Sequence, residues 1–299
     1  MNTKNLTLEI ANAVERLLGN DYRVSTNDVT KNNGLVLTGL IIRRKDKNIC
    51  PTIYINQFFD SYESGVSVDA IAREIIRQYR EHDTSILFDS SEITDYERVK
   101  DKIIFQLVNT ERNAALLETI PSVEFLDFSI IFKIYFGNSQ LGNATATITN
   151  KILNLWNVGT DTIYKDAQKN TPILQEYSLR SMTETLKELG LNIGSDDEMA
   201  QIAESDIMYI LSNRQCFCGC GCIMYPHVLE NFAKKIGMGF YILPSSRHEV
   251  LLTPESDKDP HSLIQMVREV NRTQVEQEDF LSDNVYYYSK ETKEITIIQ

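Results

Sequence analysis

Apolar residues recur every three to four positions in several stretches of the chain, as expected for helices with one buried face. Leu6, Ile10 and Val14 mark the first such helix, which we expect to end at Gly19. A second helix follows Ser67, whose side chain is suited to cap it. The same spacing predicts helices over 113–118, 151–156, 160–169, 178–190, 227–236 and after Pro260.

Short runs rich in β-branched and aromatic residues predict strands, most of them paired through turns. They cover 35–43, 49–59, 103–108, 123–136, 144–149, 207–211, 240–243, 247–252, 286–288 and 294–298. The run over 123–136 is continuous enough to predict one strand buried on both faces. Hairpins are predicted near both ends of the chain, and these are not parallel strand–helix–strand units. The fold class is therefore α+β (mixed α/β), with antiparallel or mixed sheets and flanking helices.

The polar, acidic stretch 194–198 is the best candidate for a linker. It separates an N-terminal α+β part, residues 1–193, from a C-terminal α+β part, residues 199–299. The strands on each side look too few to close separate cores. We therefore expect the two parts to pack as one unit.

The chain has 299 residues, with 30 Lys and Arg against 42 Asp and Glu. Its net charge of −12 argues against a nucleic-acid partner, because a phosphate backbone needs a clustered cationic surface. No apolar leader is visible at the N-terminus, and no run is long enough to span a bilayer. We expect an acidic, soluble protein that does not contact a membrane and is cytoplasmic if its source is a bacterium.

Four of the five cysteines lie in one short segment, at positions 216, 218, 220 and 222. With His227 nearby, Cys216, Cys218, Cys220 and Cys222 resemble a ligand set for zinc or an iron–sulfur cluster. The spacing argues otherwise, because alternate residues of a strand place the thiols about 6.6 Å apart along one face. A small-residue turn packed under neighbouring elements is the preferred interpretation, with metal and redox roles as alternatives. We expect no stoichiometric metal and no cofactor.

A second candidate site follows Pro244, where hydroxyl, imidazole and carboxylate groups are close in sequence. Ser245 or Ser246 with His248 would suit a hydrolase, and Glu249 supplies a carboxylate. If a strand begins at Arg247, however, Ser246 and His248 share one face and Glu249 points away from the imidazole. A polar loop with His248 partly or fully buried and hydrogen-bonded is the structural alternative, and we expect Glu249 to pair with a cation or a backbone donor.

Three weaker candidates for ligand binding are cationic or amide side chains: Arg247, Asn271 and Arg272. Arg272 could position an anion, although a role in ending the last long helix is the simpler interpretation. Asp127, inside the apolar run, is a candidate buried carboxylate that would need a partner, and we expect a structural ion pair.

Several segments together resemble the bacterial "domain of unknown function 5688" family. They lie at 32–34, 37–40, 51–56, 95–100, 125–127, 167, 170–172, 208–213, 225–226, 241–246, 248–250, 271–273 and 281–285. The resemblance covers nearly the whole chain and implies no activity. The cysteines depart from it, since small residues are expected there, which argues further against a metal site.

The leading hypothesis is a non-enzymatic protein that binds a partner protein or a small ligand. It depends on the absence of any recognisable catalytic motif. The alternative is a hydrolase-like enzyme that uses Ser245 or Ser246 with His248. The two differ in whether a seryl hydroxyl lies within hydrogen-bond reach of the imidazole.

Overall fold

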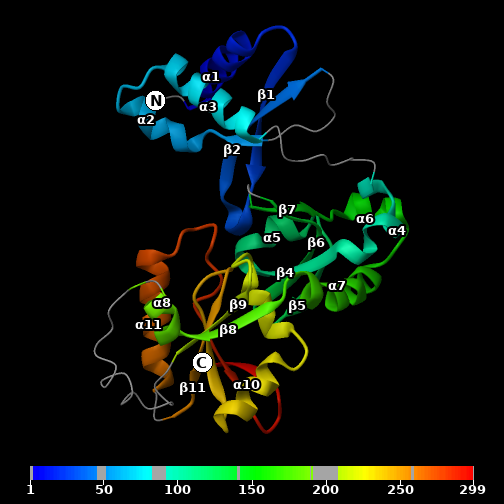
Figure 1. Ribbon diagram of the computed structural model, residues 1–299, viewed down its shortest axis with the longest axis vertical. Coiled ribbons are helices and arrows are strands. Elements are labelled where there is room, and N and C mark those ends of the chain that lie inside the picture. The colour runs from blue at the N-terminus through cyan, green and yellow to red at the C-terminus, as the bar shows by residue number, and fades with distance from the viewer. Residues whose placement is uncertain are drawn as a thin grey trace. The chain divides into compact units, whose positions relative to one another are not determined.

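The computed structural model describes residues 3–45, 52–82, 92–139, 142–188, 190, 208–256 and 259–298 (Figure 1). The chain divides into two compact units, residues 1–98 with 137–144, and residues 99–136 with 145–299. Helices and antiparallel sheets occur in both, so the predicted α+β class is confirmed. None of the helices in the described ranges combines the length and apolarity needed to cross a membrane.

The helices lie where apolar spacing predicts most of them. They are α1 (Thr3–Leu18), α2 (Phe59–Glu63), α3 (Val68–His82), α4 (Tyr96–Val99), α5 (Ala114–Leu117), α6 (Asn150–Trp156), α7 (Thr160–Leu174), α8 (Met182–Glu188), α10 (Val228–Ile236) and α11 (Pro260–Gln274). Short 3₁₀ segments are η1 (Asn32–Gly34), η2 (Asn56–Phe58), η3 (Glu92–Thr94), η4 (Lys100–Lys102), η5 (Glu111–Asn113) and η7 (Gly219–Met224).

The strands form three sheets within the described part of the chain. They are β1 (Tyr22–Thr30), β2 (Val36–Arg44), β3 (Thr52–Tyr54), β4 (Ile103–Asn109), β5 (Ser122–Phe125), β6 (Phe128–Ser139), β7 (Gly142–Thr147), β8 (Tyr177–Ser181), β9 (Tyr209–Asn213), β10 (Phe240–Pro244), β11 (Val250–Pro254), β12 (Val285–Tyr288) and β13 (Ile295–Ile298).

In the first unit, β1, β2 and β3 form an antiparallel sheet in that order. Leu40 and Ile42 of β2 are buried with Ile10 and Val14 of α1 and with Ile75 of α3. The two helices therefore cover the sheet through the apolar faces that the sequence predicts, and Figure 1 shows them beside β1 and β2.

In the second unit, six strands follow the order β13-β12-β10-β11-β9-β8. The other sheet runs β4-β6-β5, with β7 also paired to β6. The linker predicted at 194–198 lies outside the described residues, although β8 before it and β9 after it are antiparallel neighbours. The division into parts 1–193 and 199–299 stays a prediction.

Several predicted elements are wrong. Of the strand predicted over 49–59, the described residues form a strand only at Thr52–Tyr54, and 56–63 are helical. The helix predicted over 178–190 begins only at Met182, because Tyr177–Ser181 form β8.

The run 123–136 is not one strand, because Leu126 adopts a left-handed backbone (φ 56°) and the chain turns there into the β5–β6 hairpin. The helix predicted over 160–169 does not stop before Pro172, because α7 continues to Leu174. The residues before Pro172 anchor that turn to the β4 region, since Thr171 Oγ1 accepts from Phe105 N at 3.0 Å and Asn170 Nδ2 donates to Lys100 O at 2.8 Å.

Candidate functional site

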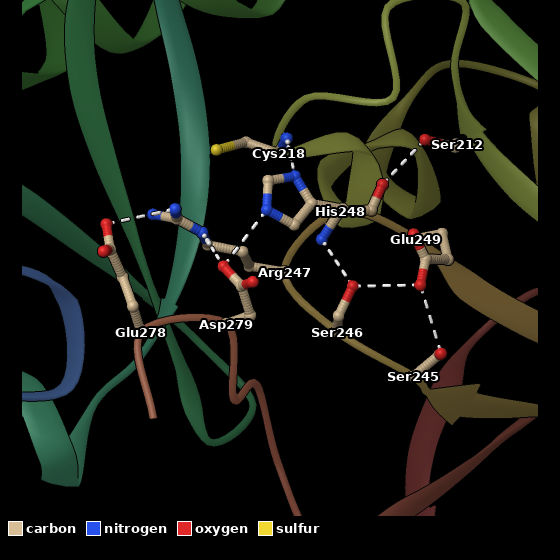
Figure 2. A network of polar contacts seen from close by, with 9 residues as sticks. All are labelled: Ser212, Cys218, Ser245, Ser246, Arg247, His248, Glu249, Glu278 and Asp279. Carbon is tan, nitrogen blue, oxygen red and sulfur yellow. Dashed lines mark hydrogen bonds and ion pairs between the residues drawn. The ribbon is translucent and has the colours of Figure 1, made fainter. Parts of the chain in front are cut away.

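The candidate residues after Pro244 lie in the loop of the β10–β11 hairpin. Pro244 is paired with Val250, so β11 begins at Val250 and not at Arg247 as predicted. The loop residues are therefore not arranged by strand alternation. Their contacts with two other turns define the His248 network, drawn in Figure 2. It consists of Ser212, Cys218, Ser245, Ser246, Arg247, His248, Glu249, Glu278 and Asp279.

Both ring nitrogens of His248 are engaged. Nδ1 accepts a hydrogen bond from the backbone N–H of Cys218 at 3.2 Å. This bond places the ring proton on Nε2, which donates to Oδ1 of Asp279 at 3.1 Å (Figure 2). The side chain is 24% exposed, which falls within the predicted partial or full burial, and the predicted hydrogen bonding is confirmed. The residue that orients the imidazole is Asp279 and not Glu249.

The backbone of His248 is held as firmly as its ring. Its N–H donates to Ser246 Oγ at 3.0 Å, and its carbonyl accepts from Ser212 Oγ at 2.7 Å. The same carbonyl accepts from Gly219 N at 3.0 Å. His248 thus joins the hairpin loop, the end of β9 and the backbone of the cysteine segment at Cys218 and Gly219.

Arg247 connects the loop to the turn that follows α11. Its Nε donates to Asp279 Oδ1 at 2.8 Å and its terminal nitrogen pairs with Glu278 at 3.1 Å. Burial works against the charge of Arg247, but nearby Cys218, Glu278 and Asp279 outweigh it and raise the pKa of the guanidinium. Both carboxylate partners belong to the chain itself, so the guanidinium has a structural role in holding the loop to the turn after α11.

The two seryl hydroxyls are directed to Glu249. Ser245 Oγ and Ser246 Oγ donate to Oε1 of Glu249 at 3.1 and 3.0 Å. Glu249 therefore accepts from hydroxyls, where a cation or a backbone donor was predicted. The hydrogen bonds of Ser246 go to Glu249 and to the backbone of His248, and not to the imidazole.

The cysteine segment is a turn that leads into η7, not a strand. Cys216 and Cys218 have left-handed backbones (φ 49° and 51°), so the thiols do not line one face. Cys218, Cys220 and Cys222 are free and buried, whereas Cys216 is exposed. The packed small-residue turn is confirmed.

A glycine inside this turn allows it to pack closely. A Cβ atom on Gly219 would clash with Ser212 Oγ and would lie 2.6 Å from Asn213 N and 2.7 Å from His248 O. The turn therefore lies directly against β9 and the hairpin loop, at a distance that a side chain would prevent.

The proposed metal ligands are not gathered around a common point. His227 is 75% exposed and its Nδ1 contacts Glu230 at 3.3 Å, while three of the cysteines are buried. Within the described ranges, no group of three or more His, Cys, Asp or Glu side chains is placed to hold a metal ion. That the protein carries no stoichiometric metal stays a prediction.

Burial raises the pKa values of the three buried thiols, with that of Cys222 rising from 9.0 to about 12. Above pH 9 the Cys222 thiol ionises in the unfolded chain but stays protonated in the folded protein. The contribution of this thiol to the free energy of unfolding is therefore complete below pH 9 and is lost as the pH rises toward 12. The free energy of unfolding of the wild type should fall between pH 9 and pH 10. We expect this fall to be about 1 kcal/mol smaller in Cys222→Ala. Denaturant titrations under reducing conditions measure this fall.

Cys216→Ala is the control for this experiment, because that side chain is exposed. Its free energy of unfolding at neutral pH should equal that of wild type. If the free energy of unfolding fell equally between pH 9 and pH 10 in wild type and in Cys222→Ala, the raised pKa of Cys222 would be contradicted.

A second polar cluster surrounds Asp127 at the β5–β6 turn. Its Oδ2 accepts from Ser282 Oγ at 2.7 Å and Asn284 Nδ2 at 3.0 Å, and its Oδ1 accepts from Tyr286 Oη at 2.6 Å. Burial, followed by the Asp127 contact, raises the pKa of Tyr286. The expected ion pair is replaced by three neutral donors. Asp127, Ser282 and Asn284 also line an open hollow of about 580 Å³.

The remaining ligand-binding candidates are also engaged within the chain. Asn271 Nδ2 donates to Ser282 O and to Asp283 Oδ1, both at 2.8 Å. Asn271 therefore fixes the segment that surrounds Asp127. Arg272 lies inside α11, exposed and paired with Glu269 at 2.8 Å.

Residues 3–290 match the model of a family described as "Family of unknown function (DUF5688)". The chain belongs to this family. The DUF5688 match includes the His248 network and the Asp127 cluster, and it confirms the resemblance found in the sequence. No curated protein and no solved structure matches the chain. The family description supplies no activity.

Sequence reasoning missed the acidic partners of the network, Glu278 and Asp279. The available signal is the run of acidic and amide residues that follows α11. These carboxylates lie 31 or 32 positions from Arg247 and His248, and a single sequence does not indicate which distant cation each one meets.

Proposed function

We propose that this protein acts by binding a partner protein or a small ligand and is not an enzyme, with the bacterial cytoplasm as its compartment. The observation that carries the proposal is the occupancy of His248. Its Nδ1 accepts from Cys218 N and its Nε2 donates to Asp279, so neither nitrogen is free to take a proton from a substrate or a nucleophile. The buried thiols support the same reading, because burial disfavours the thiolate.

The alternative is a hydrolase that uses Ser245 or Ser246 with His248. That chemistry needs a hydroxyl bonded to the imidazole, which then accepts the hydroxyl proton as the oxygen attacks a carbonyl or phosphoryl centre. The serines instead donate to Glu249, and Ser246 also accepts from the His248 backbone. An active arrangement would require one of the two hydroxyls to leave Glu249 and the imidazole Nδ1 to release the N–H of Cys218.

A histidine variant separates the two functions. We expect His248→Ala to lower the free energy of unfolding by about 1–3 kcal/mol, because Cys218 N and Asp279 lose a partly buried hydrogen-bond partner. Wild type should show no turnover above buffer on a panel of ester, amide and phosphoester substrates. Thermal melts and the substrate panel measure both outcomes.

His227→Ala is the matched control, since that histidine is largely exposed, and its melting temperature should equal that of wild type. The hydrolase would be established instead if wild type turned over a substrate while His248→Ala and Ser246→Ala melted normally and lost that activity.

A further inference from the structure

The first unit carries a shallow groove where the C-terminal part of α3 meets the end of α1. Its lining is Leu17, Arg73, Ile76, Arg77, Arg80 and Glu81, around a volume of about 480 Å³. Leu17 is 40% exposed, so an apolar side chain faces solvent in the groove. Three arginines of α3 project from the same side of the helix, because they are spaced three or four residues apart: Arg73, Arg77 and Arg80.

These three arginines differ in their partners. Arg77 is held by Glu74 and Glu81, with both ion pairs at 2.6 Å. The guanidinium groups of Arg73 and Arg80 form no ion pair or hydrogen bond with the described part of the chain, and both residues are exposed. The groove thus presents two uncompensated cations beside an apolar contact.

The charge of the groove is opposite to that of the whole chain. Its lining has three arginines and one glutamate, whereas the protein carries a net charge of −12. The groove therefore favours an anionic partner locally. A nucleic acid fits less well, because a phosphate backbone would meet few cations here and repulsion from the rest of the protein.

We propose that this groove docks an acidic amphipathic helix of a partner protein, an inference that rests on the binding function proposed above. Arg73 and Arg80 are seven residues apart on α3, which separates their positions by roughly 10 Å along the helix axis. Two carboxylates seven residues apart on a partner helix have the same spacing, and each can bond a guanidinium. An apolar residue midway between them lies on the same face and packs on Leu17 and Ile76.

The test uses the full chain and a fluorescein-labelled helical peptide with two glutamates seven residues apart and leucines midway. A peptide with glutamines in place of the glutamates is the matched probe. We expect the acidic peptide to bind at least about tenfold more tightly than the glutamine peptide, and binding to weaken as salt is added.

The double variant Arg73→Gln with Arg80→Gln should lose about tenfold or more in affinity for the acidic peptide. Arg43→Gln, an exposed arginine on β2 outside the groove, should bind as wild type does. Circular dichroism checks that the variants keep their fold. Leu17→Ala should weaken the binding of both peptides.

Equal affinity for the two peptides, or equal binding by the double variant, would overturn the proposal. So would tighter binding of a single-stranded oligonucleotide or of vesicles of phosphatidylserine than of the acidic peptide, if that binding were lost in the double variant. Each result is independent of the substrate panel, which tests the proposed function through His248. A failure at the groove and a failure of the binding hypothesis are therefore distinguishable.

Discussion

Replacing Gly219 with alanine is expected to destabilise the protein by about 3 kcal/mol or more. The added Cβ would lie 2.6 Å from Asn213 N and 2.7 Å from His248 O, and these are backbone atoms that cannot move as a flexible side chain would. The cysteine turn would have to separate from β9 and the hairpin loop, and the Gly219 N to His248 O bond would lengthen. Denaturant midpoints at neutral pH measure the loss.

Gly159→Ala is the control for this variant, because nothing lies within 4 Å of a Cβ built there. Because Gly159 is the N-cap of α7, where alanine is less favourable than glycine, the loss of stability should stay at or below about 1 kcal/mol. If the two alanine variants melted alike, the close approach at Gly219 would not be a feature of the folded protein.

Asp127→Ala is expected to reduce the free energy of unfolding by about 3 kcal/mol. The substitution removes a charged acceptor from Ser282, Asn284 and Tyr286 together, and the Tyr286 side chain is only 2% exposed. Its hydroxyl would remain buried without that acceptor. Chemical denaturation of the variant measures the change.

The neighbouring carboxylate Glu124 supplies the control, since it is exposed on β5. Glu124→Ala should stay within about 0.5 kcal/mol of wild type. In a double-mutant cycle, Asp127→Ala and Tyr286→Phe should show a coupling of about 1 kcal/mol. Additive effects would argue against the bond between the two side chains.

Amphipathic helices could be predicted from the sequence because the spacing of their apolar residues involves only residues that are close in sequence. The faces of α1 and α3 are buried as their apolar spacing indicates, and Ser67 Oγ accepts from Ala70 N at 3.3 Å at the start of α3. The strand β1 was missed because its sequence, YRVSTNDVT, is mostly polar and exposed. Its pairing with β2 is a tertiary contact that no local pattern reports.

The candidate site shows the same limit. That His248 is at least partly buried and hydrogen-bonded could be predicted from the polar loop between two apolar strands. The arrangement within the loop could not, because β11 begins three residues later than the apolar pattern indicates. The role of Asp127 was predicted in part: the carboxylate is held by partners, but they are neutral groups from the distant segment 282–286.

The joining of distant turns by the His248 network has a consequence for the order of folding. The bonds from His248 to Cys218 and to Asp279 each span about thirty residues, so they close large loops in the unfolded chain. Pairing of β9, β10 and β11 already brings two of these turns together. We infer that the network forms after the folding transition state. Its loss should therefore speed unfolding and leave the folding rate largely unchanged.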